Sequence, residues 1–372
     1  MTGVLPMVEF LNGHSFFVTQ LHKKYNTKPV ALHATYQFGD TPEYSYGKRE
    51  RLRQAGIWWV ENDQFYAGNY LVINGDMMEG FNASDVALHA WEPVEPSAFA
   101  TSRDPTGTGD GGVSLHLQAD ALQRRRLQDA FALAHLLGRT LVLPTLKCHC
   151  DRYWWLLHGC RTPGAERMPL PYECPMDHVF EPSMWFKANL HFRQAGFLQS
   201  SRLPKAVLNS RAKLPQNLCK CQSEAANEEK LAQCEHEYWG TLRADDTLEY
   251  APGEGKVATH GQAVHKDAYH LHPMTMPESA AASPEDAKLK QARILEVDVK
   301  ALDTFCWSGN AQFDRSMRAA LDMHTGFCPR ELNKIPPNWK PETHPLNCSW
   351  GYTVPTPLGV VSKERRENMK QT

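Results

Sequence analysis

The chain has 372 residues, a length that suits two domains better than one, and 42% of them are hydrophobic, which is enough for a sizeable core. Lys and Arg number 40 against 42 Asp and Glu, so the net charge is −2 and no overall basic field indicates a nucleic-acid partner. No run of about 18 apolar residues predicts a membrane span, and the N-terminus lacks the pattern of a signal peptide.

Short apolar runs and one helical stretch alternate over the first 75 residues. Residues 14–18 fit either a strand or the start of a helix, and residues 29–36 predict a buried strand. Residues 46–55 are rich in charged side chains and predict a helix that ends at Gly56. Residues 57–60 (IWWV) then predict another strand.

Residues 76–115 have the composition of a connector, because residues 101–112 (TSRDPTGTGDGG) are nearly all turn and flexible-linker chemistry. Residues 118–137 predict a helix, with apolar side chains at three- and four-residue spacing, ended by Gly138. The run TLVL at residues 140–143 predicts a short buried strand. A helix, a glycine and a strand in this order indicate an α/β fold.

The rest of the chain is less regular. Residues 175–186 predict a mixed element and residues 294–299 a strand, whereas residues 223–233 and 274–286 have the composition of surface insertions. We therefore expect four segments: residues 1–75, a linker at 76–115, an α/β domain with disordered insertions at 116–330, and a proline-rich, charged tail at 331–372.

Ten cysteines occur without a C-x-x-C pair. The run Cys148-His149-Cys150 leaves zinc open, but the usual paired spacing of zinc sites is absent. Disulfides in an oxidising lumen are the favoured interpretation, with buried free thiols as the alternative.

The clearest candidates for ligand-binding residues lie between residues 33 and 49. His33 falls near the end of a predicted strand, where open α/β sheets bind ligands and where neutral imidazole can hold a divalent metal. Gly39 and Gly47 let backbone approach a ligand closely, and Lys48 and Arg49 can neutralise a diphosphate. On the pattern alone, a structural histidine beside a solvated basic helix is the favoured interpretation of these residues.

Three segments in fixed order resemble one family: LNGHSFFV at residues 11–18, KPVALHATYQFG at 28–39 and GKRERLR at 47–53. They are similar to the plant and algal nucleotide-diphospho-sugar transferases that include the extensin arabinosyltransferases. The family resembles GT-A glycosyltransferases, so residues 1–75 would be the C-terminal part of a GT-A-like domain.

The resemblance implies what the site would bind. A D-x-D pair and a histidine hold Mn²⁺ or Mg²⁺ on the donor diphosphate in GT-A enzymes, which makes His33 the metal candidate and Lys48 the phosphate candidate. The implied donor is a UDP-sugar, plausibly UDP-arabinofuranose, and the implied acceptor is a hydroxyproline-rich cell-wall glycoprotein. The implied reaction retains anomeric configuration, in the Golgi lumen, with a membrane anchor upstream of this chain.

One element of the family pattern is missing. No D-x-D triplet occurs in the 372 residues, and the similar triplets at residues 61–63 (END) and 296–298 (EVD) lie downstream of where the family carries it. The resemblance therefore implies that these residues by themselves lack appreciable transferase activity. It leaves open a truncated enzyme or a pseudoenzyme that acts as a non-catalytic glycosylation partner.

A second resemblance begins at residues 123–144 and extends to about residue 215. The same arabinosyltransferases carry a similar segment, and its helix–RTLVLP unit also resembles the first α/β unit of GDP-fucose O-fucosyltransferases. A core helix with Arg139 in solvent is the favoured interpretation over a second, fucosyltransferase-like site. Asp177 and His178 could form an acid–base pair, but we expect Asp177 to cap a helix.

Overall fold

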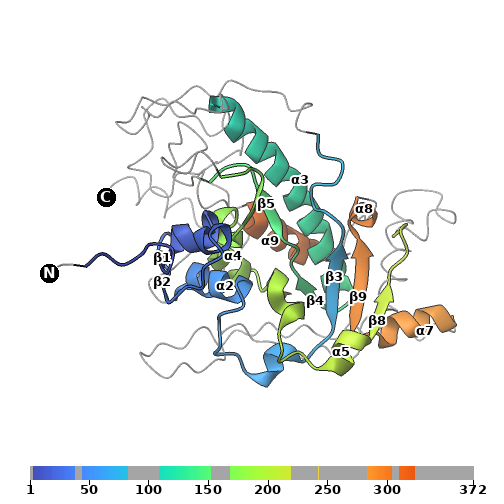
Figure 1. Cartoon of the computed structure of the whole chain (residues 1–372). Coiled ribbons are helices and arrows are strands. Elements are labelled where there is room, and N and C mark those ends of the chain that lie inside the picture. Colours follow the sequence, from blue (N-terminus) through green and yellow to red (C-terminus); the bar gives the residue numbers. More distant parts are fainter. Residues whose placement is uncertain are drawn as a thin grey trace, which may run out of the picture.

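The computed structural model describes residues 3–37, 44–82, 109–151, 168–218, 242, 283–303 and 310–322. Within these ranges the chain forms a mixed α/β structure around parallel strands, as the sequence predicted (Figure 1). No helix in these ranges is both long and apolar enough to cross a lipid bilayer.

A five-stranded parallel sheet forms the centre of the molecule, in the order β7-β4-β3-β9-β8. Its strands are β3 (Tyr70–Asn74), β4 (Thr140–Val142), β7 (Phe192–Arg193), β8 (Arg211–Lys213) and β9 (Ile294–Asp298). Strand β3 is central, since Tyr70 pairs with Thr140 of β4 on one side and with Ile294 of β9 on the other.

Strand β3 was not predicted, although its sequence explains it. The run YLVIN lies between Gly68 and Gly75. Both glycines have positive φ, so the extended backbone stops near each end of the strand. Tyr70 and Leu71 are fully buried, because a central parallel strand is covered on both faces.

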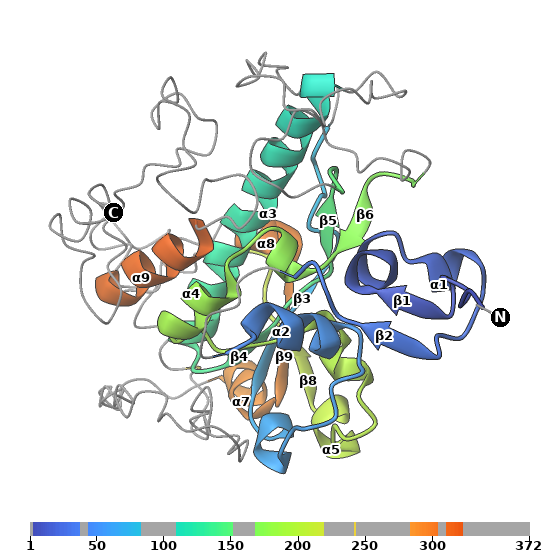
Figure 2. The same ribbon diagram turned by 90° about the vertical axis from the view of Figure 1, so that its left-hand side faces the viewer.

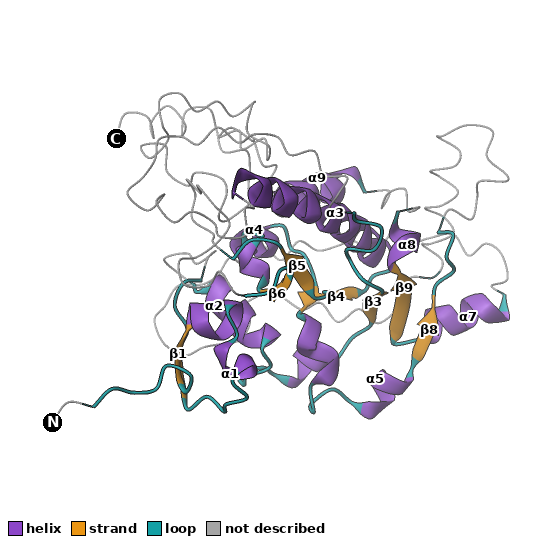
Figure 3. Ribbon diagram, turned by 45° about the horizontal axis from the view of Figure 1, so that its top comes forward, coloured by secondary structure: helices purple, strands orange, loops and turns teal. Residues whose placement is uncertain are grey.

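Helices cover the two faces of the sheet (Figure 3). Helix α3 (Gly109–Leu136) packs on β3 and β4, and α9 (Ala311–Asp322), α8 (Val299–Leu302) and α4 (Pro182–Lys187) lie on the same side. The opposite face is covered by η2 (Asp63–Tyr66), η5 (Ala195–Gln199) and α5 (Lys205–Asn209). Helix α7 (Pro284–Gln291) packs against β8 at the sheet edge.

A small antiparallel ribbon extends from the sheet. Strand β5 (Leu146–Cys148) pairs with β6 (Tyr172–Cys174), and a disulfide joins Cys148 to Cys174. Cys150 is also disulfide-bonded, so the disulfide interpretation is confirmed for these cysteines and the zinc alternative is wrong.

The N-terminal unit, residues 3–37, lies to one side of the sheet (Figure 2). Its strands β1 (Phe10–Asn12) and β2 (Ala31–His33) form a separate parallel pair, and between them run the π-helical turn η1 (His14–Val18) and the short helix α1 (Leu21–Lys24). Helix α2 (Tyr46–Gln54) follows and packs against α4, η5 and the turn η4 (Met176–His178).

Two strand predictions in this region need correction. Residues 29–36 contain β2, but the strand is not buried: among the described residues it pairs with β1 alone, and its Ala31 and His33 are exposed. Residues 57–60 form no strand, and Trp59 is 83% exposed, because this segment runs over the surface after α2 without a partner strand among the described residues. Helix α2 itself is confirmed, with Gly56 at positive φ just beyond its end.

The expected segments share the central sheet. Strand β3 belongs to residues 1–75, yet it pairs with β4 and β9 of the expected α/β domain at 116–330. Helix α3 begins at Gly109, inside the stretch expected to be a linker, while residues 83–108 and the tail at 331–372 lie outside the described residues. The GT-A-like assignment stays a prediction.

The prediction for the side chain of Arg139 was wrong. We expected it in solvent, but it is buried and its guanidinium donates to the backbone oxygens of Ala292 and Leu289. It thereby ties the turn after α3 to the end of α7. Burial lowers its pKa to about 10, with the nearby Arg293 contributing.

Candidate functional site

The carboxyl ends of β1 and β2 bring two of the family-like segments together. Asn12 pairs with His33 in register, and the chain then turns so that the backbone N–H of Gly13 donates to Thr35 Oγ1 at 3.3 Å. A Cβ on Gly13 would lie 1.8 Å from the carbonyl oxygen of Thr35, so only glycine fits there. The approach of these two loops explains the glycine of the N-G-H segment.

The turn η1 follows directly and has unusual geometry. Its start is fixed by a reciprocal pair, in which the N–H of Ser15 donates to Asn12 Oδ1 at 2.8 Å and the N–H of Asn12 donates to Ser15 Oγ at 2.9 Å. Opposite it, Tyr36 has φ of +55° and its ring meets that of His14 edge-to-face at 6.5 Å. Single π-helical turns and left-handed non-glycine residues are frequent at functional sites.

The predicted site residues lie on two different secondary-structure elements. His33 ends β2 with an exposed side chain, whereas Gly47, Lys48 and Arg49 lie in the first turn of α2, which packs against the core. Gly39 lies outside the described residues. The structure therefore does not test the diphosphate and metal roles, which stay predictions.

Helix α2 is not the solvated basic helix of the alternative interpretation. Arg49 is only 7% exposed, and its guanidinium donates to Glu50 Oε1 at 3.0 Å and to Tyr44 Oη at 2.7 Å. It also lies 4.6 Å from the ring centroid of Phe186. Protein groups thus already surround Arg49, while Lys48 is half-buried.

Glu50 is the shared acceptor of a buried hydrogen-bond network between α2 and the sheet. It accepts hydrogen bonds from Arg49, from Arg53 at 2.8 Å and from Gln194 at 2.8 Å. Burial by itself would raise the pKa of Glu50, but the guanidinium groups of Arg53 and Arg49 outweigh it, so the net pKa is lowered. The carboxylate is therefore charged and compensated.

Arg51 and Asp177 form a completely buried ion pair. The Arg51 Nε donates to both carboxylate oxygens of Asp177, at 2.7 and 2.8 Å. Both terminal nitrogens of Arg51 are buried and have no hydrogen-bond partner in the described part of the chain. We expected Asp177 to cap a helix, but Pro175 occupies the N-cap position of η4 and Asp177 lies inside the turn. The pair joins two segments of the resemblance that are far apart in sequence.

Two histidines border this ion pair. A hydrogen bond of 2.9 Å joins His178 Nδ1 to the hydroxyl of Tyr172. Burial is the main cause, and Arg51 the second, of a pKa of His178 that lies well below its ordinary value. His14 on η1 likewise has a pKa lowered by burial and then by Arg51. Its Nε2 is buried and has no hydrogen-bond partner among the described residues. Sequence reasoning noted His178 but could not place it beside Arg51.

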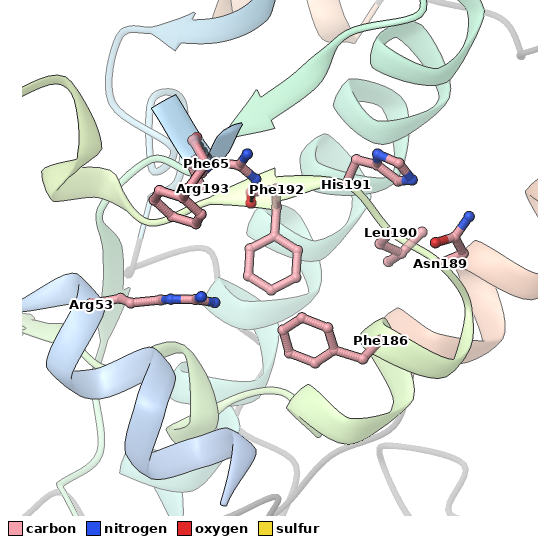
Figure 4. Close-up of a pocket in the computed structure, with 8 residues that line it drawn as sticks. All are labelled: Arg53, Phe65, Phe186, Asn189, Leu190, His191, Phe192 and Arg193. Carbon is pink, nitrogen blue, oxygen red and sulfur yellow. Dashed lines mark hydrogen bonds between the residues drawn. The ribbon is translucent and has the colours of Figure 1, made fainter. Parts of the chain in front are cut away.

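A small pocket lies where α2 meets the start of β7 (Figure 4). Phe186 and Phe192 line it, with ring centroids 5.4 Å apart, and so do Arg53 and Arg193. Its free volume holds about one water molecule. Arg53 is already bound to Glu50 and Glu61, and Arg193 donates to the Phe65 carbonyl at 2.9 Å, so the pocket offers no free charge to a ligand.

The described residues do not by themselves fit a Mn²⁺ or Mg²⁺ site. Such ions prefer several oxygen ligands, and no group of three His, Cys, Asp or Glu side chains that could hold a metal occurs in the described ranges. The two near matches to D-x-D are structural: Asn62 Oδ1 accepts from the N–H of Phe65, and Asp298 caps α8 by accepting from the N–H of Lys300.

Comparison with known proteins gives one informative relative. The chain is 30% identical over 216 residues to arabinosyltransferase XEG113 of Arabidopsis thaliana. The match covers 56% of this chain and 29% of that protein, so the chain spans less than a third of the relative's length. No protein-family model matches the chain. No solved structure matches it either.

Proposed function

We propose that this chain is part of a glycosyltransferase, and specifically of an arabinosyltransferase. The observation that carries the proposal is the 30% identity to a protein named as an arabinosyltransferase. The meeting of the N-G-H and H-A-T-Y segments at the carboxyl ends of β1 and β2 supports it, because ligands of parallel α/β sheets bind at that edge.

The finer assignments are part of the same proposal. The donor is UDP-arabinofuranose, the acceptor is an arabinosylated hydroxyproline-rich glycoprotein, and the anomeric configuration is retained. The protein works in the Golgi lumen, with which the disulfide between Cys148 and Cys174 agrees, since disulfides persist in oxidising compartments.

Charge on the leaving diphosphate is what such an enzyme must stabilise. Of the two cations predicted for this role, Lys48 is the better candidate, because Arg49 is buried against Glu50, Tyr44 and Phe186. His33, exposed at the end of β2, is the candidate metal ligand. Oxygen ligands for Mn²⁺ or Mg²⁺ would have to join it from outside the described residues, so we assign no step to the metal.

A non-catalytic glycosylation partner is the second candidate. It is favoured by the lack of a three-ligand group around His33 in the described ranges and by the missing D-x-D triplet. A partner of this kind would bind a sugar nucleotide or an acceptor glycan without turnover.

The test uses the full natural gene product and its single-residue variants, each expressed in the cells that naturally make the protein. Each protein is titrated with UDP-arabinofuranose and UDP-glucose, and transfer to an arabinosylated hydroxyproline peptide is measured with Mn²⁺. We expect preferential binding of UDP-arabinofuranose and transfer, with Lys48→Ala weakening donor binding by about tenfold, or about 1.4 kcal/mol. Lys205→Ala, an exposed lysine on α5, is the matched control and should leave binding unchanged.

Each other outcome is decisive. Donor binding without transfer identifies the non-catalytic partner. Equal binding of both nucleotides removes the arabinose assignment, and absence of both binding and transfer contradicts the proposal. An unchanged donor affinity in Lys48→Ala would remove the phosphate role of Lys48 alone.

A further inference from the structure

The connector between α2 and η2, residues 57–61, exposes apolar side chains to solvent. Trp59 is 83% exposed and Val60 is 71% exposed, and no charged residue lies between Gly56 and Glu61. Such exposure is uncommon for tryptophan, which is on average largely buried in folded proteins. Adjacent apolar side chains that stay in solvent make this connector a candidate binding surface.

The two ends of the connector are fixed by the rest of the chain. At its start, the N–H of Ile57 donates to the carbonyl oxygen of Leu52 at 3.0 Å. At its end, the side chain of Glu61 accepts from Arg53 Nε at 2.6 Å, and its backbone oxygen accepts from Arg202 at 2.7 Å. The exposed tryptophan thus lies between two fixed points, so little further ordering of the backbone is needed when a ligand binds.

Polar side chains border the connector. Arg202, which holds its end, also donates to Asp63 at 2.9 Å, and the Asp63 side chain is fully exposed. The guanidinium carbon of Arg202 lies 4.7 Å from the ring centroid of Tyr66. The two opposite charges leave this border without net charge. An aromatic face beside such groups suits a neutral sugar, whose C–H face packs on the ring while its hydroxyls bond to polar side chains.

The apolar area of the connector is too small for a stable protein interface. Trp59, Val60 and Ile57 together expose on the order of 300 Å², since one aromatic side chain contributes about 150–250 Å². A specific protein interface buries about 800 Å² on each partner. The smaller area matches a few sugar rings, so the surface favours a glycan over a second copy of the chain.

We propose that residues 57–61, with Trp59 as the main contact, bind a glycan of the acceptor glycoprotein. The inference rests on the proposed function, in which the acceptor is an arabinosylated, hydroxyproline-rich glycoprotein. Arabinose is uncharged, as are residues 57–60, so binding comes from packing on the indole and from hydrogen bonds at the polar border. Trp59 therefore positions the acceptor and takes no part in the reaction at the donor.

Helix α2 separates this surface from the residue proposed for the donor diphosphate. Lys48 lies in the first turn of α2, and the connector begins beyond its last residue, Gln54. A rise of about 1.5 Å per residue over the six positions from 48 to 54 places these backbone positions about 9 Å apart. A proline-rich acceptor rises about 3.1 Å per residue, so it spans this distance with about three residues. The bound glycan is therefore a neighbour of the reacting one along the acceptor.

Binding to the full natural gene product, measured without donor, tests the site directly. The probe is an arabinosylated hydroxyproline peptide, compared with the same peptide without sugar. We expect Trp59→Ala to weaken binding of the glycosylated peptide by about tenfold, and Trp59→Phe, which keeps an aromatic face, by about threefold at most. Tyr25→Ala is the matched control, because Tyr25 is also exposed, by 57%, but lies at the C-cap of α1. It should leave the affinity unchanged.

The spacing gives a second readout during transfer. An acceptor with one glycan should be used equally well by the unmodified protein and by Trp59→Ala. For an acceptor with a second glycan about three residues away, Trp59→Ala should raise KM about tenfold and leave kcat and the affinity for UDP-arabinofuranose unchanged. If the protein binds the donor without transfer, the binding measurement decides alone.

Oxidative footprinting of tryptophan identifies what covers the surface. Trp59 should be oxidised readily in the free natural protein and protected by the glycosylated peptide. Protection in the free protein would show that another segment or a second copy already covers it, and this result overturns the inference.

Three binding results would also overturn it: an unchanged affinity in Trp59→Ala, an equal loss in Tyr25→Ala, or equal binding of the peptide without sugar. Failure of the proposed function looks different, because it appears as absence of donor binding and of transfer. Glycan binding that depends on Trp59 in a protein without either activity would contradict the proposed function and leave the glycan site in place.

Discussion

At the scale of the residue, the buried ion pair between Arg51 and Asp177 joins α2 to the core. We expect Asp177→Asn to lower the free energy of unfolding by about 3–5 kcal/mol, because it leaves a buried guanidinium without its counter-charge. The measurement is denaturant unfolding followed by tryptophan fluorescence. Asp63→Asn, in the exposed pair with Arg202, is the control and should leave the midpoint unchanged.

A double variant separates charge balance from packing. Arg51→Met combined with Asp177→Leu removes both charges at similar volume, so it should recover most of the loss seen in Asp177→Asn. If the double variant is as unstable as the single one, the pair holds α2 through its specific geometry instead.

The sequence could not have placed these residues together. Arg51 and Asp177 both lie in segments that resemble the same family, but 126 positions separate them and neither carries a local signal of burial. Composition also predicted that the cations of α2 would be solvated, whereas Arg49, Glu50 and Arg51 are all buried. Ion pairs between distant segments depend on tertiary packing, which a single sequence does not show.

At the scale of the element, the turn after β3 is fixed by close packing on α8. Gly75 has φ of +110°, and a Cβ there would lie 2.7 Å from Val299 Cγ1. We expect Gly75→Ala to destabilise the protein by about 2–3 kcal/mol through backbone strain and this clash. Gly80→Ala, at φ of +78° but with open space around it, should cost only about 1 kcal/mol. Thermal unfolding of both variants measures the difference, and equal losses would show that the clash with Val299 is relieved at no cost.

Helices and strands with strong local patterns were predictable from the sequence. The helix of residues 118–137 appears as α3, which begins earlier, at Gly109, and ends at Leu136. The strands of residues 140–143 and 294–299 appear as β4 and β9, which begin where predicted and end at Val142 and Asp298. Strand β3 was missed because YLVIN is a short apolar run that periodicity cannot assign. The run IWWV was assigned as a strand for the same reason and is not one.

At the scale of the whole molecule, the disulfide between Cys148 and Cys174 holds the β5–β6 ribbon, on which both the main core and the N-terminal unit rest. It closes a loop across a sequence separation of 26, so replacing both cysteines by alanine should lower stability by roughly 3 kcal/mol. Differential scanning calorimetry measures the loss. Because both cysteines are fully buried, brief treatment of the folded protein with reductant should leave this disulfide intact in peptide mapping, and its immediate reduction would contradict this burial.

The position of β3 at the centre of the sheet also affects how the chain folds during its synthesis on the ribosome. Asn74 of β3 bonds to Glu296 of β9 across 222 residues, so one edge of β3 has no native partner until β9 has been synthesised. At about 5–20 residues per second, a ribosome needs roughly 10–45 s to cover that distance. An apolar strand edge left open for so long is a site for pairing with other chains. Nascent chains that stop before residue 294 should therefore bind chaperones, and those that extend past residue 322 should not.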